Sequence, residues 1–262
     1  MKSYFLLFLI LLGLISSCDL SGGVRPKILE AQNAIKESRF NDAVIIYSQL
    51  LEMNLPNHLR IKINYQLGQI NYLYLNKGKT ALGFYQKILQ FKIDPLWQVK
   101  ILEKIAQIYS QDVKDYRQAA NYYQILMNYQ PRLEMYDFYF SQYAKNTFNQ
   151  GNLSKAKDIY TSLLKSTDQN NIADANYYLG LIYSYEKKYE QSINYWYEAL
   201  KFEKRKVKIV RIKYLIANSY ESSEKLKQAY NIYYSLLKEH PNPNLIKGRL
   251  ESLYARRVAR KR

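Results

Sequence analysis

The sequence has 262 residues, of which 48% are hydrophobic and 15% aromatic, and this content excludes an intrinsically disordered chain. Only six prolines and nine glycines are present, which favours helices. The single cysteine excludes a disulfide within the chain, and the formal net charge of +17 predicts a strongly basic surface.

The chain begins with Lys2 and then a nearly unbroken apolar run of 12 residues from Tyr4 to Ile15. A membrane-spanning helix needs about 20 residues, so this run is too short to cross a bilayer. A positive start followed by a short apolar run is typical of a secretory signal peptide. We therefore predict that residues 1–17 are a signal peptide.

The residues Ile15, Ser16, Ser17 and Cys18 resemble the lipobox of bacterial lipoproteins. The resemblance implies cleavage before Cys18 and a lipid on its thiol, so that residues 18–26 are a lipidated cysteine and a tether. It also implies a lipid-anchored protein of the bacterial cell envelope that faces the periplasm, at either the outer or the inner membrane. The alternatives are an ordinary signal peptide with an incidental cysteine, and a buried apolar thiol.

Residues 27–244 repeat one pattern six times. A small residue is followed four positions later by an aromatic residue, and these two share one face of a helix. Another small residue lies 12 or 13 positions upstream, where it lets a second helix approach closely. The pairs are Ala43/Tyr47, Ala81/Tyr85, Ala119/Tyr123, Ala156/Tyr160, Ser192/Trp196 and Ala229/Tyr233. The upstream residues are Ala31, Gly68, Ala106, Ala144, Gly180 and Ala217.

The segment from Asn176 to Lys204 resembles a tetratricopeptide repeat (TPR). It carries that family's Leu-Gly, Tyr, Tyr, small, aromatic and Ala positions as Leu179, Gly180, Tyr183, Tyr189, Ser192, Trp196 and Ala199. The resemblance implies an all-α fold, a right-handed α-solenoid of six TPR-like helix pairs over residues 27–244. Residues 245–262 are expected to form a C-terminal helix that covers the end of the stack, followed by a basic tail. The repeat spacing exceeds the usual 34 residues, which predicts longer helices or turns.

In the TPR family the first helix of each pair lines a groove that binds a segment of another protein, and the resemblance implies such a groove here. The alternative is that these are ordinary solvated or half-buried helix positions. The family's carboxylate clamp is absent, because Tyr65/Gln69 and Glu103/Gln107 occupy its positions. The implied groove residues are Tyr65, Gln69, Tyr72, Lys100, Gln107, Lys145, Phe148, Tyr177, Tyr185, Arg211, Tyr214 and Asn218; Phe138, Asp174 and Glu221 occupy further groove positions.

The C-terminal sequence ARRVARKR is strongly basic. Its charges are too many to bury without partners, so we expect it to follow the end-covering helix and to attract anionic lipid or an acidic protein. The alternative is a solvated charged end, and an exported protein has little access to nucleic acid. The residues concerned are Arg256, Arg257, Arg260, Lys261 and Arg262.

No metal-ligand spacing, phosphate-binding loop or nucleophile motif is present, so the sequence predicts a protein without enzymatic activity, cofactor or small-molecule substrate. We expect a lipid-anchored scaffold that binds other envelope proteins. Its length and architecture resemble the BamD-like lipoprotein of the outer-membrane β-barrel assembly machine. The alternatives are a pilotin-like lipoprotein of type IV pilus assembly and a recruiter of cell-wall enzymes.

Overall fold

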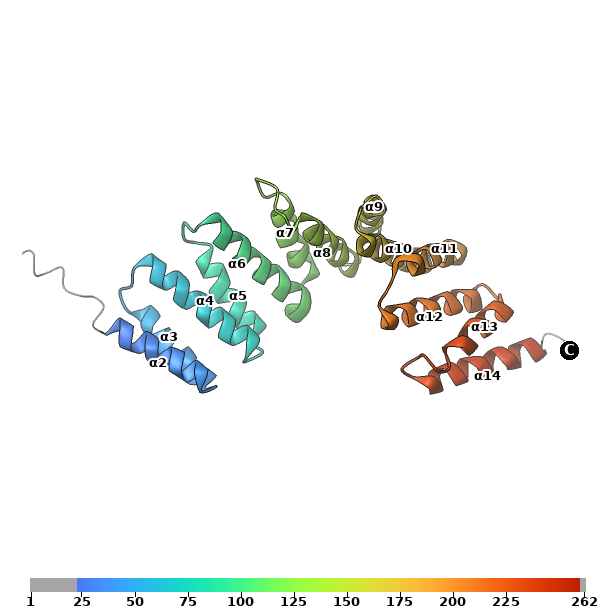
Figure 1. Ribbon diagram of the computed structural model, residues 1–262, viewed down its shortest axis with the longest axis horizontal. Coiled ribbons are helices and arrows are strands. Elements are labelled where there is room, and N and C mark those ends of the chain that lie inside the picture. The colour runs from blue at the N-terminus through green and yellow to red at the C-terminus, as the bar shows by residue number, and fades with distance from the viewer. Residues whose placement is uncertain (1–22, 260–262) are drawn as a thin grey trace, which may run out of the picture. The chain divides into compact units, whose positions relative to one another are not determined.

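The structure is a computed structural model that describes residues 23–259. These residues form 13 α-helices, labelled α2 to α14 in Figure 1, and one π-helical turn, with no β-strand among them. The chain divides into two compact units, one ending at Tyr122 and the other beginning at Tyr123. The all-α prediction is therefore confirmed for the described part of the chain.

The first unit is a stack of helix pairs. Within it α2 packs against α3 and α4 against α5, and the second helix of each of these pairs also packs against the first helix of the next pair. Its helices are α2 (Val24–Lys36), α3 (Phe40–Glu52), α4 (Asn57–Leu73), α5 (Gly78–Ile88), α6 (Pro95–Ile108), the π-helical turn (Tyr109–Val113) and the first part of α7 (Tyr116–Met127).

The second unit continues the same pairing from α8 onwards, and its last helix, α14, packs against α13. In Figure 1, α12, α13 and α14 lie side by side at the red end of the colour scale. Its helices are α8 (Tyr136–Asn149), α9 (Leu153–Leu163), α10 (Gln169–Tyr185), α11 (Tyr189–Phe202), α12 (Lys206–Ser222), α13 (Leu226–Leu236) and α14 (Pro243–Ala259). The first helices α10 and α12 have 17 residues each, which accounts for part of the long repeat spacing.

The turn inside each helix pair contains one residue in the left-handed region of backbone conformation. Only the turn after α8 uses a glycine there, Gly151, with φ of 86°. The other five turns use residues that carry a Cβ atom, at φ between 52° and 61°, although this conformation favours glycine. These residues are Ser38, Asn76, Lys114, Lys187 and Glu224.

The repeating small and aromatic residues form the core, as predicted. All six aromatic residues of the pattern, from Tyr47 to Tyr233, are at most 4% exposed. A Cβ atom added to Gly68 would lie 2.7 Å from Cε1 of Tyr85, and one added to Gly180 would overlap the indole of Trp196. The upstream small residue therefore leaves room for the aromatic ring of its own helix pair, and Tyr85 also shares a cluster with Ile101 and Ile105 of the next pair.

The end-covering helix is present, but its boundary differs from the prediction. Ile246, Leu250 and Leu253 of α14 are buried in the cluster that contains Tyr233, so α14 closes the stack. The helix continues to Ala259, so residues 255–259 are part of it and do not form a tail that follows it. No helix of residues 23–259 combines the length and the apolar content that a bilayer span requires.

Candidate partner-binding surface

In the first unit, predicted groove residues of α4 and α6 meet around a buried tyrosine. Tyr65 is 7% exposed and packs edge-on against Trp97, with ring centroids 5.2 Å apart. Nζ of Lys100 lies 4.8 Å from the Tyr65 centroid and 5.2 Å from the Trp97 centroid, while the lysine stays exposed. A cation beside two ring faces is attracted to both of them. Tyr65 therefore contributes packing, and Lys100 is the side chain that a partner can reach.

Three further predicted residues of the first unit are half-buried beside this site. Nε2 of Gln69 donates a hydrogen bond of 3.2 Å to the hydroxyl of Tyr65, and Tyr72 packs into the same cluster. Nε2 of Gln107 donates to Oε1 of Gln111 at 3.4 Å. The side-chain amides of these two predicted groove residues are thus partly used within the unit.

The same arrangement recurs in the second unit around Tyr177, which is 4% exposed. Its backbone carbonyl accepts a hydrogen bond of 3.1 Å from Nε1 of Trp196. Nζ of Lys208 and the guanidinium carbon of Arg211 lie 4.8 and 5.7 Å from its ring centroid. Burial raises the pKa of the Tyr177 hydroxyl even though Arg211 opposes the shift, so the phenol stays protonated at neutral pH.

The two tyrosine sites are equivalent in the repeat. Tyr65 and Tyr177 each precede the small residue of their own first helix, Gly68 or Gly180, by three positions. Lys100 and Arg211 each precede the small residue of the following repeat's first helix, Ala106 or Ala217, by six positions. The same repeat geometry therefore places an exposed cation over a buried tyrosine in each unit.

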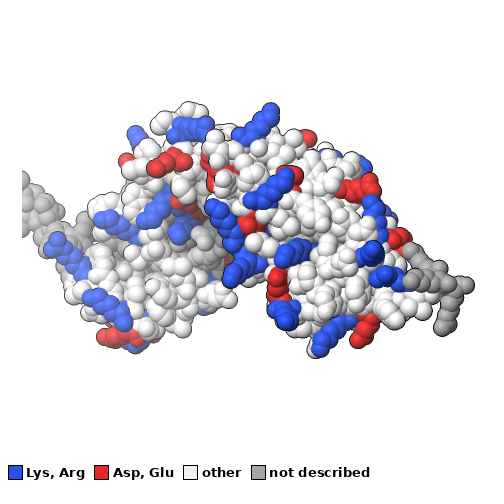
Figure 2. All heavy atoms as spheres, turned by 45° about the vertical axis from the view of Figure 1, so that its right-hand side comes forward, with Lys and Arg blue, Asp and Glu red and all other residues white. Residues whose placement is uncertain are grey.

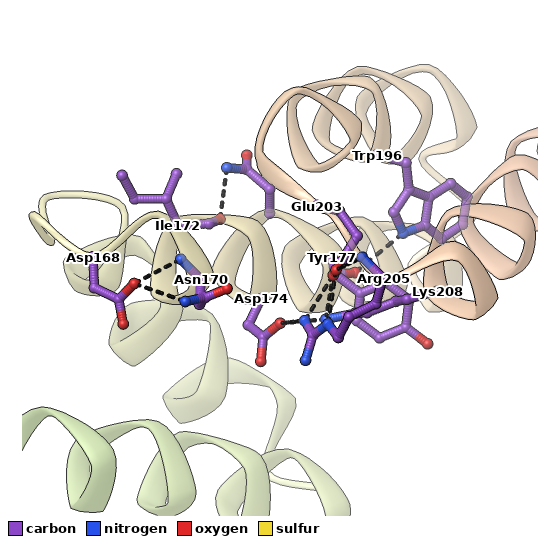
Figure 3. A network of polar contacts seen from close by, with 10 residues as sticks. Asp168, Asn170, Ile172, Asp174, Tyr177, Trp196, Glu203, Arg205 and Lys208 are labelled. Atoms are coloured by element: carbon purple, nitrogen blue, oxygen red, sulfur yellow. Dashed lines mark hydrogen bonds and ion pairs between the residues drawn. The ribbon is translucent and has the colours of Figure 1, made fainter.

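Acidic and basic side chains fix the start of α12 against α10 (Figure 3). The Glu203 side chain is only 2% exposed. Its carboxylate accepts hydrogen bonds of 2.7 Å from Nε and Nη2 of Arg205 and forms an ion pair of 3.3 Å with Lys208. Arg205 also donates to Asp174 at 2.8 Å, and Lys208 pairs with Asp174 as well. Two carboxylates thus hold two cations beside Tyr177.

The environment of Glu203 favours its charged form. Burial by itself raises the pKa of the Glu203 carboxyl, but the hydrogen bonds from Arg205 and the charge of Lys208 outweigh it and lower the pKa to about 2. The carboxylate is therefore ionised at any physiological pH. Its role is structural, because the side chain is almost fully buried and both carboxylate oxygens are bonded within the unit.

The remaining α8 and α10 residues of the predicted groove supply aromatic surface. The Phe148 ring centroid lies 5.1 Å from that of Tyr178 and 6.1 Å from that of Tyr185. Tyr185 is 65% exposed and Phe138 46% exposed, and Lys145 of α8 is exposed as well. These side chains can offer contact area to a partner at a small entropic cost, because aromatic side chains have few rotamers.

On α12, Tyr214 and Asn218 both face the core tyrosine Tyr233. Tyr214 packs edge-on against Tyr233 at 5.7 Å, and Oδ1 of Asn218 accepts a hydrogen bond from the Tyr233 hydroxyl. That hydroxyl also bonds Glu221 at 3.2 Å. Asn218 therefore positions a core residue, and its carbonyl oxygen already has a partner.

The prediction of a free basic tail is wrong for Arg256. Its guanidinium bonds Glu221 at 3.2 Å and Glu224 at 2.7 Å, so it ties α14 to α12 and to the turn after it. Arg257 lies over Tyr230, with the guanidinium carbon 5.8 Å from the ring centroid. Arg260, Lys261 and Arg262 lie outside the described residues, as does Cys18.

Sequence reasoning missed several residues of this surface, namely Trp97, Glu203, Arg205 and Lys208. The basic run from Lys201 to Lys213 was a signal for the last two, but it did not reveal which charges are paired. Among residues 23–259 no group of His, Cys, Asp and Glu is arranged to hold a metal ion.

No protein-family model matches the chain, and no curated protein matches it either. Solved structures are similar in fold. The apo form of the quorum sensor NprR from B. thuringiensis matches with a TM-score of 0.57 and 16% identity, over 98% of this chain and 76% of that one. PilW, a type IV pilus biogenesis factor, matches with a TM-score of 0.55 and 12% identity, over 88% of this chain and 97% of PilW.

A third structure, YrrB, a TPR protein with an unusual peptide-binding site, matches with a TM-score of 0.49 and 18% identity, over 68% of this chain and 85% of YrrB. At such identities the likeness concerns the fold alone. Together with the helix pairs that stack within each unit and their buried small and aromatic residues, the likeness to NprR and PilW shows a TPR-like helical-repeat architecture.

Proposed function

We propose that this protein is a non-enzymatic scaffold that binds other proteins through the first helices of its repeats. The observation that carries the proposal is the exposed cation over a buried tyrosine at equivalent positions of both units, Lys100 over Tyr65 and Arg211 over Tyr177. The rings restrain these cations before a partner arrives, which reduces the entropy lost on binding. Exposed Tyr185 and Phe138 add the aromatic surface that is enriched at protein interfaces.

The binding role is tested with the double variant Lys100→Ala/Arg211→Ala. Partners that copurify stoichiometrically with the wild-type protein from crosslinked membranes should be lost or strongly reduced, because both restrained cations are gone. The control is Lys165→Ala, an exposed lysine on the segment after α9 that is not a predicted groove residue. Equal recovery of partners by the double variant and the control would contradict the proposed surface.

We also propose that the scaffold is held at a membrane of the bacterial cell envelope by lipid on Cys18. The lipobox resemblance supports this, and two or more acyl chains anchor a protein stably. Cys18→Ser should release the protein from washed membranes or leave the signal peptide uncleaved. An unmodified Cys18 in the mass spectrum of the mature wild-type protein would refute the anchor. The basic residues 260–262 are proposed to add an attraction to anionic lipid that weakens with salt.

Type IV pilus assembly is the envelope process that a specific observation favours. The likeness to PilW, a type IV pilus biogenesis factor, covers 88% of this chain and 97% of that protein, and this supports the proposal of a role in pilus assembly. The BamD-like role in outer-membrane β-barrel assembly rests on length and architecture, and recruitment of cell-wall enzymes rests on the scaffold character alone. Deletion of the gene separates the three, since loss of pili, loss of outer-membrane β-barrels and altered cell-wall cleavage are distinct phenotypes.

A further inference from the structure

An apolar hollow of about 440 Å³ lies in the second unit where α12 begins. Its walls are Val207, Val210 and Tyr214 on one face of α12, opposite His240 and Pro241 of the turn before α14. The Tyr214 ring that lines it packs against His240, with ring centroids 5.3 Å apart, and against Tyr233, with ring centroids 5.7 Å apart. A second hollow of about 380 Å³ shares Lys206, Val210 and Glu239 with it.

The rim of this hollow is basic. Lys206 and Arg211 line it, and neither has an acidic partner among the described residues. Three neighbouring cations are paired, since Arg205 and Lys208 pair with Asp174 and Glu203, and Lys213 pairs with Glu239 at 3.1 Å. In Figure 2, Lys and Arg outnumber Asp and Glu over the face that is drawn. The positive end of the α12 dipole adds to the positive potential around Lys206 and Arg211. The first turn of α12 contains no acidic residue that would offset it.

Two groups at the hollow are suited to a peptide backbone. Nδ1 of His240 lies 3.0 Å from the backbone oxygen and 3.1 Å from the backbone nitrogen of Asn242, so its own turn occupies Nδ1 and Nε2 is the ring nitrogen left for a ligand. The Glu239 carboxylate can accept an N–H, and it pairs with only one lysine. Val207 is 84% exposed, a large value for an apolar side chain beside an apolar hollow.

We propose that this hollow docks a short acidic segment of a partner protein, with a bulky apolar side chain in the hollow and carboxylates at Lys206 and Arg211. The charge of the rim selects an acidic partner. The Glu239 carboxylate on the same rim can accept a backbone N–H of a peptide, a donor that the phosphate group of an anionic lipid lacks. The inference rests on the proposed function in that the partner is a protein and in that Arg211 and Tyr214 belong to both sites, whereas Lys206, Val207 and Val210 extend the site beyond the predicted groove.

The test uses the full-length chain and two fluorescein-labelled peptides of equal length, one built from Asp and Glu around Leu-Phe and one with Ser in place of Leu-Phe. Binding is followed by fluorescence anisotropy, and the methyl signals of Val207 and Val210 are followed by NMR. The variants are Val207→Ser and Lys206→Glu. The matched controls are Leu96→Ser, which also removes an exposed apolar side chain, at 80% exposure, and Lys165→Glu.

We expect the Leu-Phe peptide to bind, to shift the Val207 and Val210 methyl signals and to bind at least about tenfold more weakly to each variant, a loss of about 1.4 kcal/mol, while the controls bind as the wild type does. Affinity should fall between about 0.1 M and 1 M salt, where the Debye length shrinks from about 10 Å to about 3 Å. The Ser peptide should bind weakly, because it lacks the apolar anchor.

Three outcomes would overturn the inference: no binding of the Leu-Phe peptide, binding to both variants as tight as to the wild type, or displacement of the peptide by phosphatidylglycerol vesicles that shift the same methyl signals. Copurification of partners with the wild-type protein distinguishes failure of the docking hollow from failure of the scaffold role. If the peptide does not bind and wild-type partners persist, the hollow is not the docking site and the scaffold role stands. If the wild-type protein recovers no partner, the scaffold role fails.

Discussion

The indole of Trp196 on α11 occupies the space where a Cβ atom of Gly180 on α10 would lie. The same indole donates its N–H to the carbonyl of Tyr177, so the ring is fixed by both packing and a hydrogen bond. The close approach of α10 and α11 therefore depends on the absence of a side chain at position 180.

Gly180→Ala should destabilise the second unit by about 1–3 kcal/mol, because the added methyl group overpacks a full core. This loss should appear even though alanine is the better helix former. Gly248→Ala in α14 is the matched control, since a Cβ atom there meets nothing within 4 Å. The control should gain about 0.5–1 kcal/mol from helix propensity. Urea denaturation followed by circular dichroism measures both, and equal effects would mean that Trp196 does not press on Gly180.

Tyr160 and Tyr233 occupy the same repeat position but differ in the partner of the hydroxyl. The Tyr160 hydroxyl is buried with no hydrogen-bond partner among the described residues, whereas that of Tyr233 bonds Asn218 and Glu221. Tyr160→Phe should therefore be neutral or stabilise by up to about 1 kcal/mol, and Tyr233→Phe should cost about 1–2 kcal/mol. If both substitutions cost the same free energy of unfolding, the hydroxyl of Tyr160 has a partner.

The low pKa of Glu203 predicts how stability depends on pH. The folded-state pKa of about 2 lies below the ordinary value of 4.5, so the carboxylate stabilises the fold fully above about pH 4.5 and progressively less as the pH falls toward about 2. Glu203→Gln should remove this part of the pH dependence and should cost about 1–3 kcal/mol at pH 7, since it removes charged hydrogen bonds to Arg205. Glu251→Gln, at an exposed site of α14, is the control and should leave the profile unchanged.

The turns inside the helix pairs offer a stabilising change. Lys187 has a φ of 59°, and its side chain has no ion pair among the described residues. Lys187→Gly should stabilise by up to about 1 kcal/mol, because glycine adopts this conformation without the Cβ clash. Gly151→Ala, at φ of 86°, should destabilise by about 1–2 kcal/mol. A lower midpoint of thermal unfolding for Lys187→Gly would show that the lysine side chain stabilises the fold by more than the strain of its left-handed backbone costs.

Much of the fold was predictable because its pattern is local. The small residue and the aromatic residue lie four positions apart on one helix, and the upstream small residue lies on the neighbouring helix of the same pair. These short separations repeat six times, so the sequence alone identified the helix pairs, the core positions such as Ala156 and Tyr160, and the need for a helix that covers the end.

The candidate surface was predictable only in part. The repeat register predicted Lys100 and Arg211 as groove residues, and both are exposed, but it did not show that Tyr65 and Tyr177 are buried beneath them. Burial of a tyrosine depends on which side chains the next repeat brings over it, and this information lies outside its own helix.

The pairing of charges was decided by the tertiary structure. Arg205 reaches Asp174 across 31 residues, and Arg256 reaches Glu221 across 35 residues, so neighbouring sequence carries no sign of either bond. Helix periodicity places a residue on a face, whereas an ion pair requires two faces from different helices to meet at a distance of a few ångströms. For this reason the sequence by itself determined the helical repeat and its core, and only the packing of α10, α12 and α14 decided which cations are neutralised and which, like Lys206, remain available to a partner.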